Sequence, residues 1–187
     1  MAIAVKDPIR SGFFAETGIQ RMAAITAIVI MALVVQSTLL VKTTVLGVIP
    51  QLTLVVVVSL AYLDGERVGV ATGFMSGLLQ DLLLPQSIVG LTALVYTLVG
   101  FSVGNLRQYA PQQSVWAPVG AVAAASAAAE AGYALLAIMF GEPWVSISFT
   151  LRVVGLVVLY NTLLMPFAFP LLRRIADRFR PEKVHRW

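Results

Sequence analysis

Charged residues and cysteine are what this sequence has least of. Lys, Arg, Asp and Glu together make up 12% of the 187 residues, and cysteine is absent. A soluble domain usually carries about 25% charged residues. With 59% hydrophobic residues and a mean hydropathy of +0.89, the chain is predicted to be an integral membrane protein. The absence of cysteine excludes disulfides, thiol catalysis and thiolate metal sites.

Signatures of catalysis are also scarce. His185 is the single histidine and stands alone in the C-terminal tail, so neither a His-based metal site nor a Ser-His-Asp arrangement can be built. The glycines do not form a phosphate loop that ends in Gly-Lys-Ser/Thr. We therefore expect no enzyme activity, no cofactor and no metal. Nucleic-acid binding is not expected either, because the basic residues are scattered over short loops and tails.

The apolar residues are grouped in long stretches with few charges. A helix needs about 20 such residues to cross a bilayer, and the chain supplies about six stretches of this kind. We expect an all-α membrane protein that forms a single six-helix transmembrane bundle, with tails at 1–21 and 173–187. The second and third spans are short and can be tilted or partly re-entrant. The expected spans are 22–41, 48–63, 67–84, 89–106, 115–140 and 147–172.

Lys and Arg residues indicate the orientation of the bundle. With six spans, eleven of them fall on the side of both termini, and two, Lys42 and Arg152, fall on the other side. Basic residues favour the cytoplasmic side, so both termini are expected in the cytoplasm. Trp116 and Trp144 lie at opposite ends of the fifth span, where aromatic rings favour the membrane interface.

Small residues recur every fourth position in two of the predicted spans. In the third span, Gly69, Gly73 and Gly77 share one helical face, and Asp81 is the next residue along it. Such a face lets another helix approach closely in lipid. It is either a packing surface within the bundle or a groove for a partner's transmembrane helix. The fifth span carries a second row of this kind, Gly120, Ala124, Ala128 and Gly132, beside Ala117, Ala121, Ala125 and Ala129.

Three ionisable residues lie inside predicted spans: Asp81, Glu130 and Arg152. Charge at membrane depth is costly, so each needs water, an interface or a partner. Asp81 and Arg152 are at similar depth near the outer boundary, so they can form a salt bridge, or Asp81 can reach interfacial water. Glu130 is near mid-depth, where Ser126 and Tyr133 can share its hydrogen bonds. The uncharged residues Gln36 and Asn161 are expected to hydrogen-bond between helices.

The end of the chain reads LLRRIADRFRPEKVHRW. Its apolar residues fall on one helical face and its basic residues mostly on the other, up to Pro181. We expect an amphipathic helix that lies on anionic lipid or docks a cytoplasmic partner. The basic residues concerned are Arg173, Arg174, Arg178 and Arg180.

One continuous stretch resembles a known family. Pro50-Gln51-Leu52 opens an apolar span, Asp64-Gly65 closes it, and GVATGFMSGLLQDLLLPQSIVGLTAL follows from Gly69 to Leu94. This combination resembles the rod shape-determining protein MreD family. The core of the resemblance is the Gly-x-x-x-Gly-x-x-x-Gly-Leu-Leu-x-Asp run, followed by Gly90-Leu91 and Ala93-Leu94.

The resemblance implies a multi-pass component of the bacterial inner membrane that takes part in cell elongation without catalytic activity of its own. The partners it implies are the bitopic protein MreC, the actin-like MreB filament, and the pair of a SEDS glycosyltransferase and a class B penicillin-binding protein. One small-residue groove would receive the MreC transmembrane helix, and the basic tails would face the filament or anionic lipid. A glycine groove can also bind a second copy of the chain, so homodimerisation stays open.

A second interpretation comes from another functional class. In size and number of spans, MreD-like chains resemble the substrate-binding subunits of energy-coupling-factor vitamin transporters, which present Ala-x-x-x-Ala surfaces to a transport partner. Ala23 and Ala27 in the first span fit such a surface. A vitamin binder should line an outward pocket with several aromatic and polar groups, and the predicted outer loops are poor in both.

Overall fold

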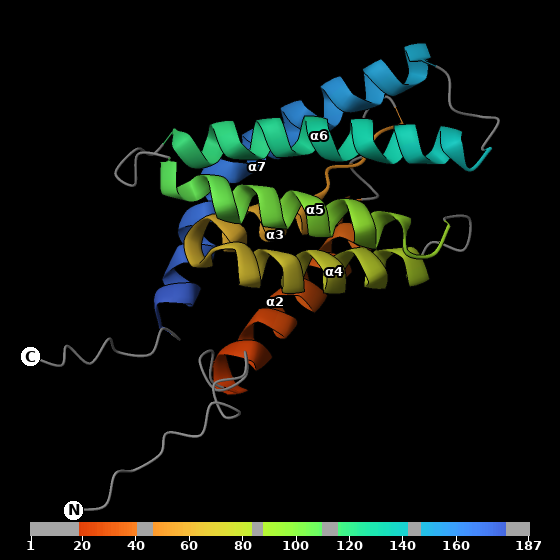
Figure 1. The fold of residues 1–187 in the computed structure, drawn as a ribbon. Helices are drawn as coiled ribbons and strands as arrows, with labels where there is room; N and C mark the ends of the chain where they lie inside the picture. Colours follow the sequence, from red (N-terminus) through yellow and green to blue (C-terminus); the bar gives the residue numbers. More distant parts are fainter. Residues whose placement is uncertain (1–18, 41–46, 84–87, 110–115, 142–146, 179–187) are drawn as a thin grey trace, which may run out of the picture.

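The computed structural model describes residues 19–40, 47–83, 88–109, 116–141 and 147–178. The regular elements within these ranges are all helices (Figure 1). The helices lie within a few residues of the apolar spans expected from the sequence, except at the end of the last one. They are α2 (Ile19–Thr38), α3 (Leu52–Asp64), α4 (Glu66–Leu83), α5 (Leu91–Leu106), α6 (Ala117–Met139) and α7 (Ile147–Arg178), with a short 3-10 helix, η3 (Arg107–Tyr109), after α5.

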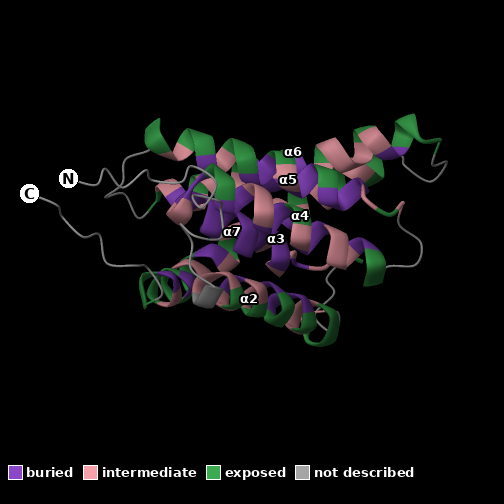
Figure 2. Ribbon diagram, turned by 60° about the horizontal axis from the view of Figure 1, so that its bottom comes forward, coloured by how far each residue is buried: buried purple, intermediate pink, exposed green. Residues whose placement is uncertain are grey.

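Helix α3 lies at the centre and packs against each of the other five α-helices that the structure describes (Figures 1 and 2). Every residue from Thr53 to Tyr62 is buried. The sequence explains this position, because LTLVVVVSLAYLD is apolar around its whole circumference and a helix of that kind is stable only where all its faces are covered.

Helix α3 is short and begins only after a non-helical stretch of chain. Its 13 residues span about 20 Å at about 1.5 Å per residue, less than the ~30 Å hydrocarbon core of a bilayer. Pro50, which cannot donate a backbone hydrogen bond, precedes the helix, and the preceding stretch from Gly47 to Gln51 is not helical. The stretch expected as the second span therefore contains a short helix, which starts only after this non-helical stretch.

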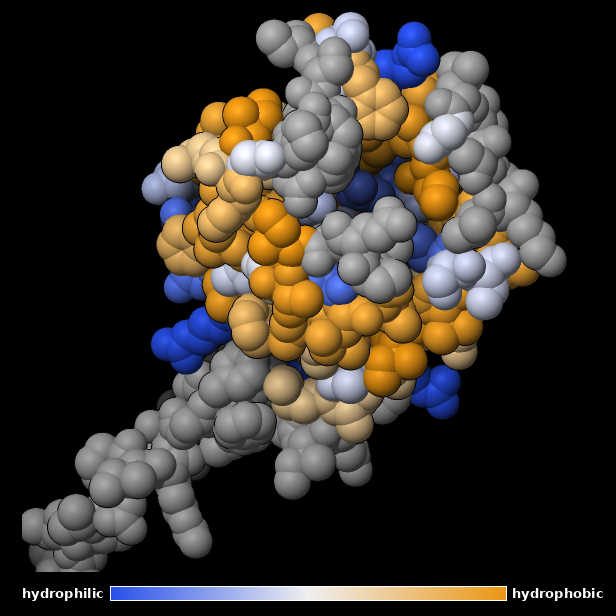
Figure 3. Space-filling model, turned by 90° about the vertical axis from the view of Figure 1, so that its right-hand side faces the viewer, coloured by the Kyte–Doolittle hydropathy of each residue, from blue (hydrophilic) through white to orange (hydrophobic). Residues whose placement is uncertain are grey.

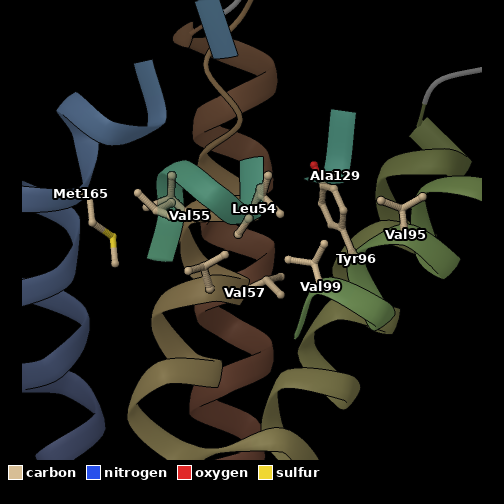
Figure 4. Packing of buried hydrophobic residues seen from close by; sticks show 11 residues of the cluster. Leu54, Val55, Val57, Val95, Tyr96, Val99, Ala129 and Met165 are labelled. Atoms are coloured by element: carbon tan, nitrogen blue, oxygen red, sulfur yellow. The ribbon is translucent and has the colours of Figure 1, made fainter. Parts of the chain in front are cut away.

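Two clusters of buried side chains hold the helices together. The larger one joins α3 to α5, α6 and α7, and Figure 4 shows Leu54, Val57, Tyr96 and Val99 packed at its centre. The second cluster joins the outer helix α2 to α3 and α4 and includes Leu172 of α7. The core thus has α3 as its common element.

Helix α7 differs from the sequence expectation at its end. We expected a span that stops at 172 and a separate basic helix, but α7 runs without a break through Pro166 and Pro170 to Arg178. Its 32 residues reach about 48 Å at about 1.5 Å per residue. Leu172 and Ala176 are buried against the bundle, so the last turns continue the packed helix instead of lying flat on lipid.

The outer surface of the bundle is apolar. Large hydrophobic side chains such as Phe74, Leu98, Leu151 and Phe167 are exposed on it. Three helices are long and apolar enough to cross a membrane by length and composition: Arg21–Thr38, Ala117–Met139 and Ser148–Arg178. An apolar exterior around a polar-containing interior is the arrangement of a membrane protein.

The helices alternate in direction, which gives the bundle two distinct ends (Figure 1). At one end lie the starts of α2, α4 and α6 and the ends of α3, α5 and α7. We call this the basic end, because Arg21, Arg67, Arg107 and Arg174 lie there. The other is the opposite end, where α3 and α5 begin.

Candidate functional site

The glycine row of α4 is filled by α5. A Cβ atom added at Gly69 would overlap the backbone carbonyl of Gly100, and one added at Gly73 would overlap the carbonyl of Tyr96. A Cβ at Gly77 would lie 2.5 Å from Cα of Ala93. The two backbones are therefore in direct contact along the whole row. This row is a packing surface inside the chain, and the alternative expectation, a groove open to a partner helix, is wrong for it.

Asp81, the fourth residue of the row, holds the start of α5. Its Oδ2 accepts hydrogen bonds from the backbone N–H groups of Gly90, Thr92 and Ala93 at 2.8, 3.1 and 3.3 Å, and its side chain is 1% exposed. The first N–H groups of a helix have no partner within it, and their positive partial charge favours a carboxylate. The buried charge is therefore satisfied by the end of the neighbouring helix.

Two expectations for Asp81 are corrected by this geometry. Arg152 is exposed on α7 and makes no salt bridge to any residue that the structure describes. Asp81 does not lie in interfacial water either, since it is buried. The salt bridge was inferred from similar predicted depth in the membrane, and depth does not tell which helices are neighbours.

The basic end is tied together by charged side chains. Arg21 of α2 forms an ion pair with Asp64 at the end of α3, and their side chains are 14% and 3% exposed. Arg107 donates a hydrogen bond to the carbonyl of Leu63 at 2.6 Å. Cations at the carbonyl end of a helix are favoured by its dipole. Arg21 and Arg107 therefore stabilise the end of α3, in addition to any effect on orientation in the membrane.

The small-residue row of α6 is open. Gly120, Ala124 and Ala128 are exposed, Gly132 is half-buried, and a Cβ atom added at Gly120 would meet nothing within 4 Å. The parallel row is divided: Ala125 and Ala129 are buried in the core, while the others are half-buried. Contrary to expectation, the two rows therefore do not form one wide flat face. The exposed surface is a narrower row, and part of the neighbouring row is buried in the core.

A groove runs beside the open row. It has a volume of about 590 Å³ and lies between α5 and α6. Most residues of its α6 wall are small, among them Ala117, Ala121, Ala124 and Ala128, and most of its α5 wall is made of larger side chains. The groove is almost entirely apolar, so it suits another apolar helix or lipid chains.

Polar side chains from several helices meet around the start of α3. Asn161 of α7, fully buried, accepts a hydrogen bond from the backbone N–H of Gln51 at 3.0 Å and donates one to Ser126 of α6 at 2.9 Å. Gln36 of α2 accepts from the backbone N–H of Thr53 at 2.9 Å. The expected interhelical hydrogen bonds of Gln36 and Asn161 are present, and both serve to cap the buried start of α3.

Glu130 belongs to the same group. Its Oε1 accepts a hydrogen bond from the side-chain amide of Gln51, which in turn accepts one from the hydroxyl of Tyr96 at 3.1 Å. The expectation that Ser126 would share the hydrogen bonds of Glu130 is wrong, because Ser126 is bonded to Asn161. Sequence neighbours one turn away were the natural candidates, whereas the actual partner comes from the non-helical stretch before α3.

A cavity opens beside this group at the opposite end of the bundle. It has a volume of about 500 Å³ and is bounded by α2, α4, α6, α7 and the stretch before α3. Figure 3 shows hydrophilic surface at the bottom of a hollow at this end, with hydrophobic residues along part of its rim. A smaller cavity of about 190 Å³ shares four of its lining residues: Gln51, Gln80, Glu130 and Tyr133.

The comparisons with known proteins decide the family. The family model described as rod shape-determining protein MreD matches residues 18–175, which is most of the chain. The chain belongs to the MreD family. No curated protein and no solved structure matches it. The family resemblance read from the sequence is confirmed, and with it a membrane component of rod-shape determination.

The MreD match covers all the sites described above except the last three residues of α7. It includes both small-residue rows, the capping carboxylate Asp81 and the polar group around Gln51 and Glu130. Sequence reasoning from the spacing of small residues found the rows and Asp81. It missed Gln80 and Gln51 as partners of the polar group, although one signal was present: both are amides in apolar segments.

Proposed function

We propose that this MreD-family chain is a non-enzymatic membrane scaffold of the cell-elongation complex, and that it binds the transmembrane helix of MreC in the groove between α5 and α6. The observation that carries this proposal is the contrast between the two small-residue rows. The row of α4 is filled by the chain itself, whereas the row of α6 is exposed beside a groove.

The dimensions of the row suit one membrane-spanning helix. From Gly120 to Gly132 it extends over 12 steps, or about 18 Å at about 1.5 Å per residue, more than half of the ~30 Å apolar thickness of a bilayer. Burial of apolar side chains does not drive association in lipid, so helices associate through close van der Waals contact across small residues. A bitopic partner supplies one helix of that length.

In this proposal both termini lie in the cytoplasm of a bacterial inner membrane, and the basic end faces the MreB filament and anionic lipid. Arg173, Arg174 and Arg178 are exposed around the last turns of α7 and can make these contacts. Arg180 lies outside the described residues. The SEDS glycosyltransferase and the class B penicillin-binding protein would join the complex on the membrane side, which links wall synthesis to the filament.

Leucine substitutions test the groove. Ala124→Leu with Ala128→Leu should abolish co-purification of MreC from native membranes, because the added side chains fill the contact row. Ala23→Leu with Ala27→Leu is the matched control, since Ala23 and Ala27 are also exposed alanines one turn apart, on α2. Thermal unfolding in detergent should be the same for both double variants, which establishes that each is folded.

The alternatives give different results in the same experiment. MreC retained by the α6 variant and lost from the α2 variant would place the partner on the wrong face and overturn the groove. A dimer of the chain that the α6 variant alone disrupts, with MreC retained, would assign the groove to a second copy. Recovery of paired ATPases with a transmembrane coupling subunit would make the chain a transporter's substrate-binding component instead.

A further inference from the structure

The cavity at the opposite end of the bundle is a second candidate site, separate from the α6 groove. Five elements contribute to it, and it is deep enough to reach Glu130 near the middle of α6. Its volume of about 500 Å³ is within the range of about 300–1,000 Å³ in which small-molecule sites fall.

The backbone around the cavity is unusual for a membrane protein. Gly47, Val48 and Ile49 line it with non-helical backbone, just before α3 begins. Non-helical backbone inside a membrane is tolerated only where it is buried in protein or lines a polar cavity. Because α3 is short, the space before its start is left open as the cavity, whereas a longer helix would occupy it.

Several polar groups at this cavity keep hydrogen-bonding capacity. Oε2 of Glu130 accepts no hydrogen bond from the residues that the structure describes, and only Oε1 is bonded to Gln51. Gln36 and Gln80 both bond through Oε1 to the hydroxyl of Thr53, at 3.0 and 2.8 Å. Oε1 of Gln36 also accepts from the backbone N–H of Thr53, so both of its lone pairs are used, whereas Oε1 of Gln80 has one lone pair left. Oε2 of Glu130 and Oε1 of Gln80 can therefore each accept a hydrogen bond from a ligand without losing a bond they already make.

The charge of the site favours a cation. Glu130 is the only charged residue among the described residues that line the cavity. The start of α3 would attract an anion, but its N–H groups at Gln51 and Thr53 already donate to Asn161 and Gln36. A carboxylate at membrane depth is stabilised by a cationic partner. The walls beyond it are largely apolar and include Leu33, Phe149 and Val157.

We propose that this cavity binds a small amphipathic molecule whose primary ammonium group donates to Oε2 of Glu130 and Oε1 of Gln80, with its apolar part against the walls of α2 and α7. The same chemistry can come from a free amine or from the ammonium headgroup of a phospholipid. This site is independent of MreC binding, so its failure would leave the α6 groove unaffected.

Thermal unfolding of the full chain in detergent tests the proposal with three probes of equal length: hexylamine, hexan-1-ol and hexanoate. A ligand that binds only the folded state raises the midpoint of unfolding. Hexylamine should raise it at concentrations where the neutral and anionic probes do not. Glu130→Gln should weaken the apparent affinity for hexylamine at least tenfold, and Asp177→Asn, which removes an exposed carboxylate at the basic end, should leave it unchanged.

Equal shifts with all three probes, or an undiminished hexylamine shift in Glu130→Gln, would overturn the proposal. If Glu130→Gln does not fold, Ala134→Phe provides the test, because it narrows the cavity and leaves the hydrogen bonds of Glu130 in place. A shift that Ala134→Phe removes supports the site, and one that it leaves intact contradicts it.

Native mass spectrometry of the chain taken from its membrane distinguishes the two sources of ammonium. Bound phosphatidylethanolamine that Glu130→Gln loses would identify a lipid headgroup as the ligand. A chain free of lipid that still responds to hexylamine would identify a free amine, and either result supports the ammonium site. Phosphatidylglycerol retained equally by the wild-type chain and Glu130→Gln, without a hexylamine response, would contradict it.

Discussion

Asn161 accepts a hydrogen bond at 3.0 Å from the backbone N–H of Gln51, a residue 110 positions earlier in the chain. This bond satisfies a backbone group that a helix start would otherwise leave without a partner in an apolar surrounding. It also connects α7 to the beginning of α3, and through Ser126 it connects both to α6.

Asn161→Leu should therefore destabilise the fold, by about 1–2 kcal/mol, the scale of interhelical hydrogen bonds in membranes. The neighbouring Thr162 offers a control, because its buried hydroxyl has no partner in the part of the chain that the structure describes. Thr162→Val should be neutral or slightly stabilising. Unfolding midpoints in detergent measure both. An Asn161→Leu variant as stable as Thr162→Val would show that the bond contributes nothing.

Gly69→Ala should be strongly destabilising, because its Cβ would overlap the backbone of Gly100, which cannot move aside like a flexible side chain. Overpacking of this kind typically costs about 1–3 kcal/mol. Gly155→Ala on α7 is the control, since a Cβ there meets nothing within 4 Å. It should be neutral or stabilising by up to about 1 kcal/mol, because alanine is the better helix former. Equal stability of the two variants would contradict the close contact of α4 with α5.

Asp81→Ala should cost about 1–2 kcal/mol, the effect of removing the residue that caps a helix start, and Asp81→Asn should cost less. Arg152→Ala should leave stability unchanged, since the two residues are not paired. The loss in free energy of unfolding of the double variant should then equal that of Asp81→Ala within about 0.5 kcal/mol. A coupling energy well above that value in the double-mutant cycle would indicate that the two residues form a salt bridge and would contradict the capping role.

Asp64→Ala should be among the most damaging single substitutions at the basic end. It leaves Arg21 with a nearly buried, unpaired charge, which typically costs about 3–5 kcal/mol. The pair Arg173–Asp177 is the contrasting case, with side chains 64% and 48% exposed. Asp177→Ala should change stability by less than about 1 kcal/mol. Chemical denaturation of both variants compares them directly, and similar losses would mean that burial of the Arg21 pair has no energetic importance.

Hydropathy was sufficient to predict where the helices lie. Each apolar span corresponds to a helix, because length and polarity are local properties of the sequence. The end of α7 is the exception, since the span was expected to stop at 172 while the helix, with Leu172 packed in the core, continues to Arg178. Local sequence patterns do not show which tertiary contacts the last turns of a helix will make.

The pairing of helices could not be predicted in the same way. The row of Gly69 and Gly73 correctly indicated a close helix contact, but the sequence did not tell whether the contact was internal. For Asp81 and Glu130 only a depth could be inferred from the sequence. Their partners, the start of α5 and Gln51, come from segments whose lateral positions depend on the whole fold. The hydrogen-bond partners of a buried carboxyl group depend on tertiary structure, which residue spacing in the sequence does not determine.

The short central helix also has a consequence for how the molecule is made. At about 20 Å, α3 is too short to be held in a ~30 Å bilayer by its own hydrophobicity. Its end is tied to Arg107 and, through Asp64, to Arg21, and the backbone before its start is bonded to Asn161 of α7. The innermost helix is synthesised well before the helix that secures its start, so biogenesis of the bundle must protect α3 until α7 has been made.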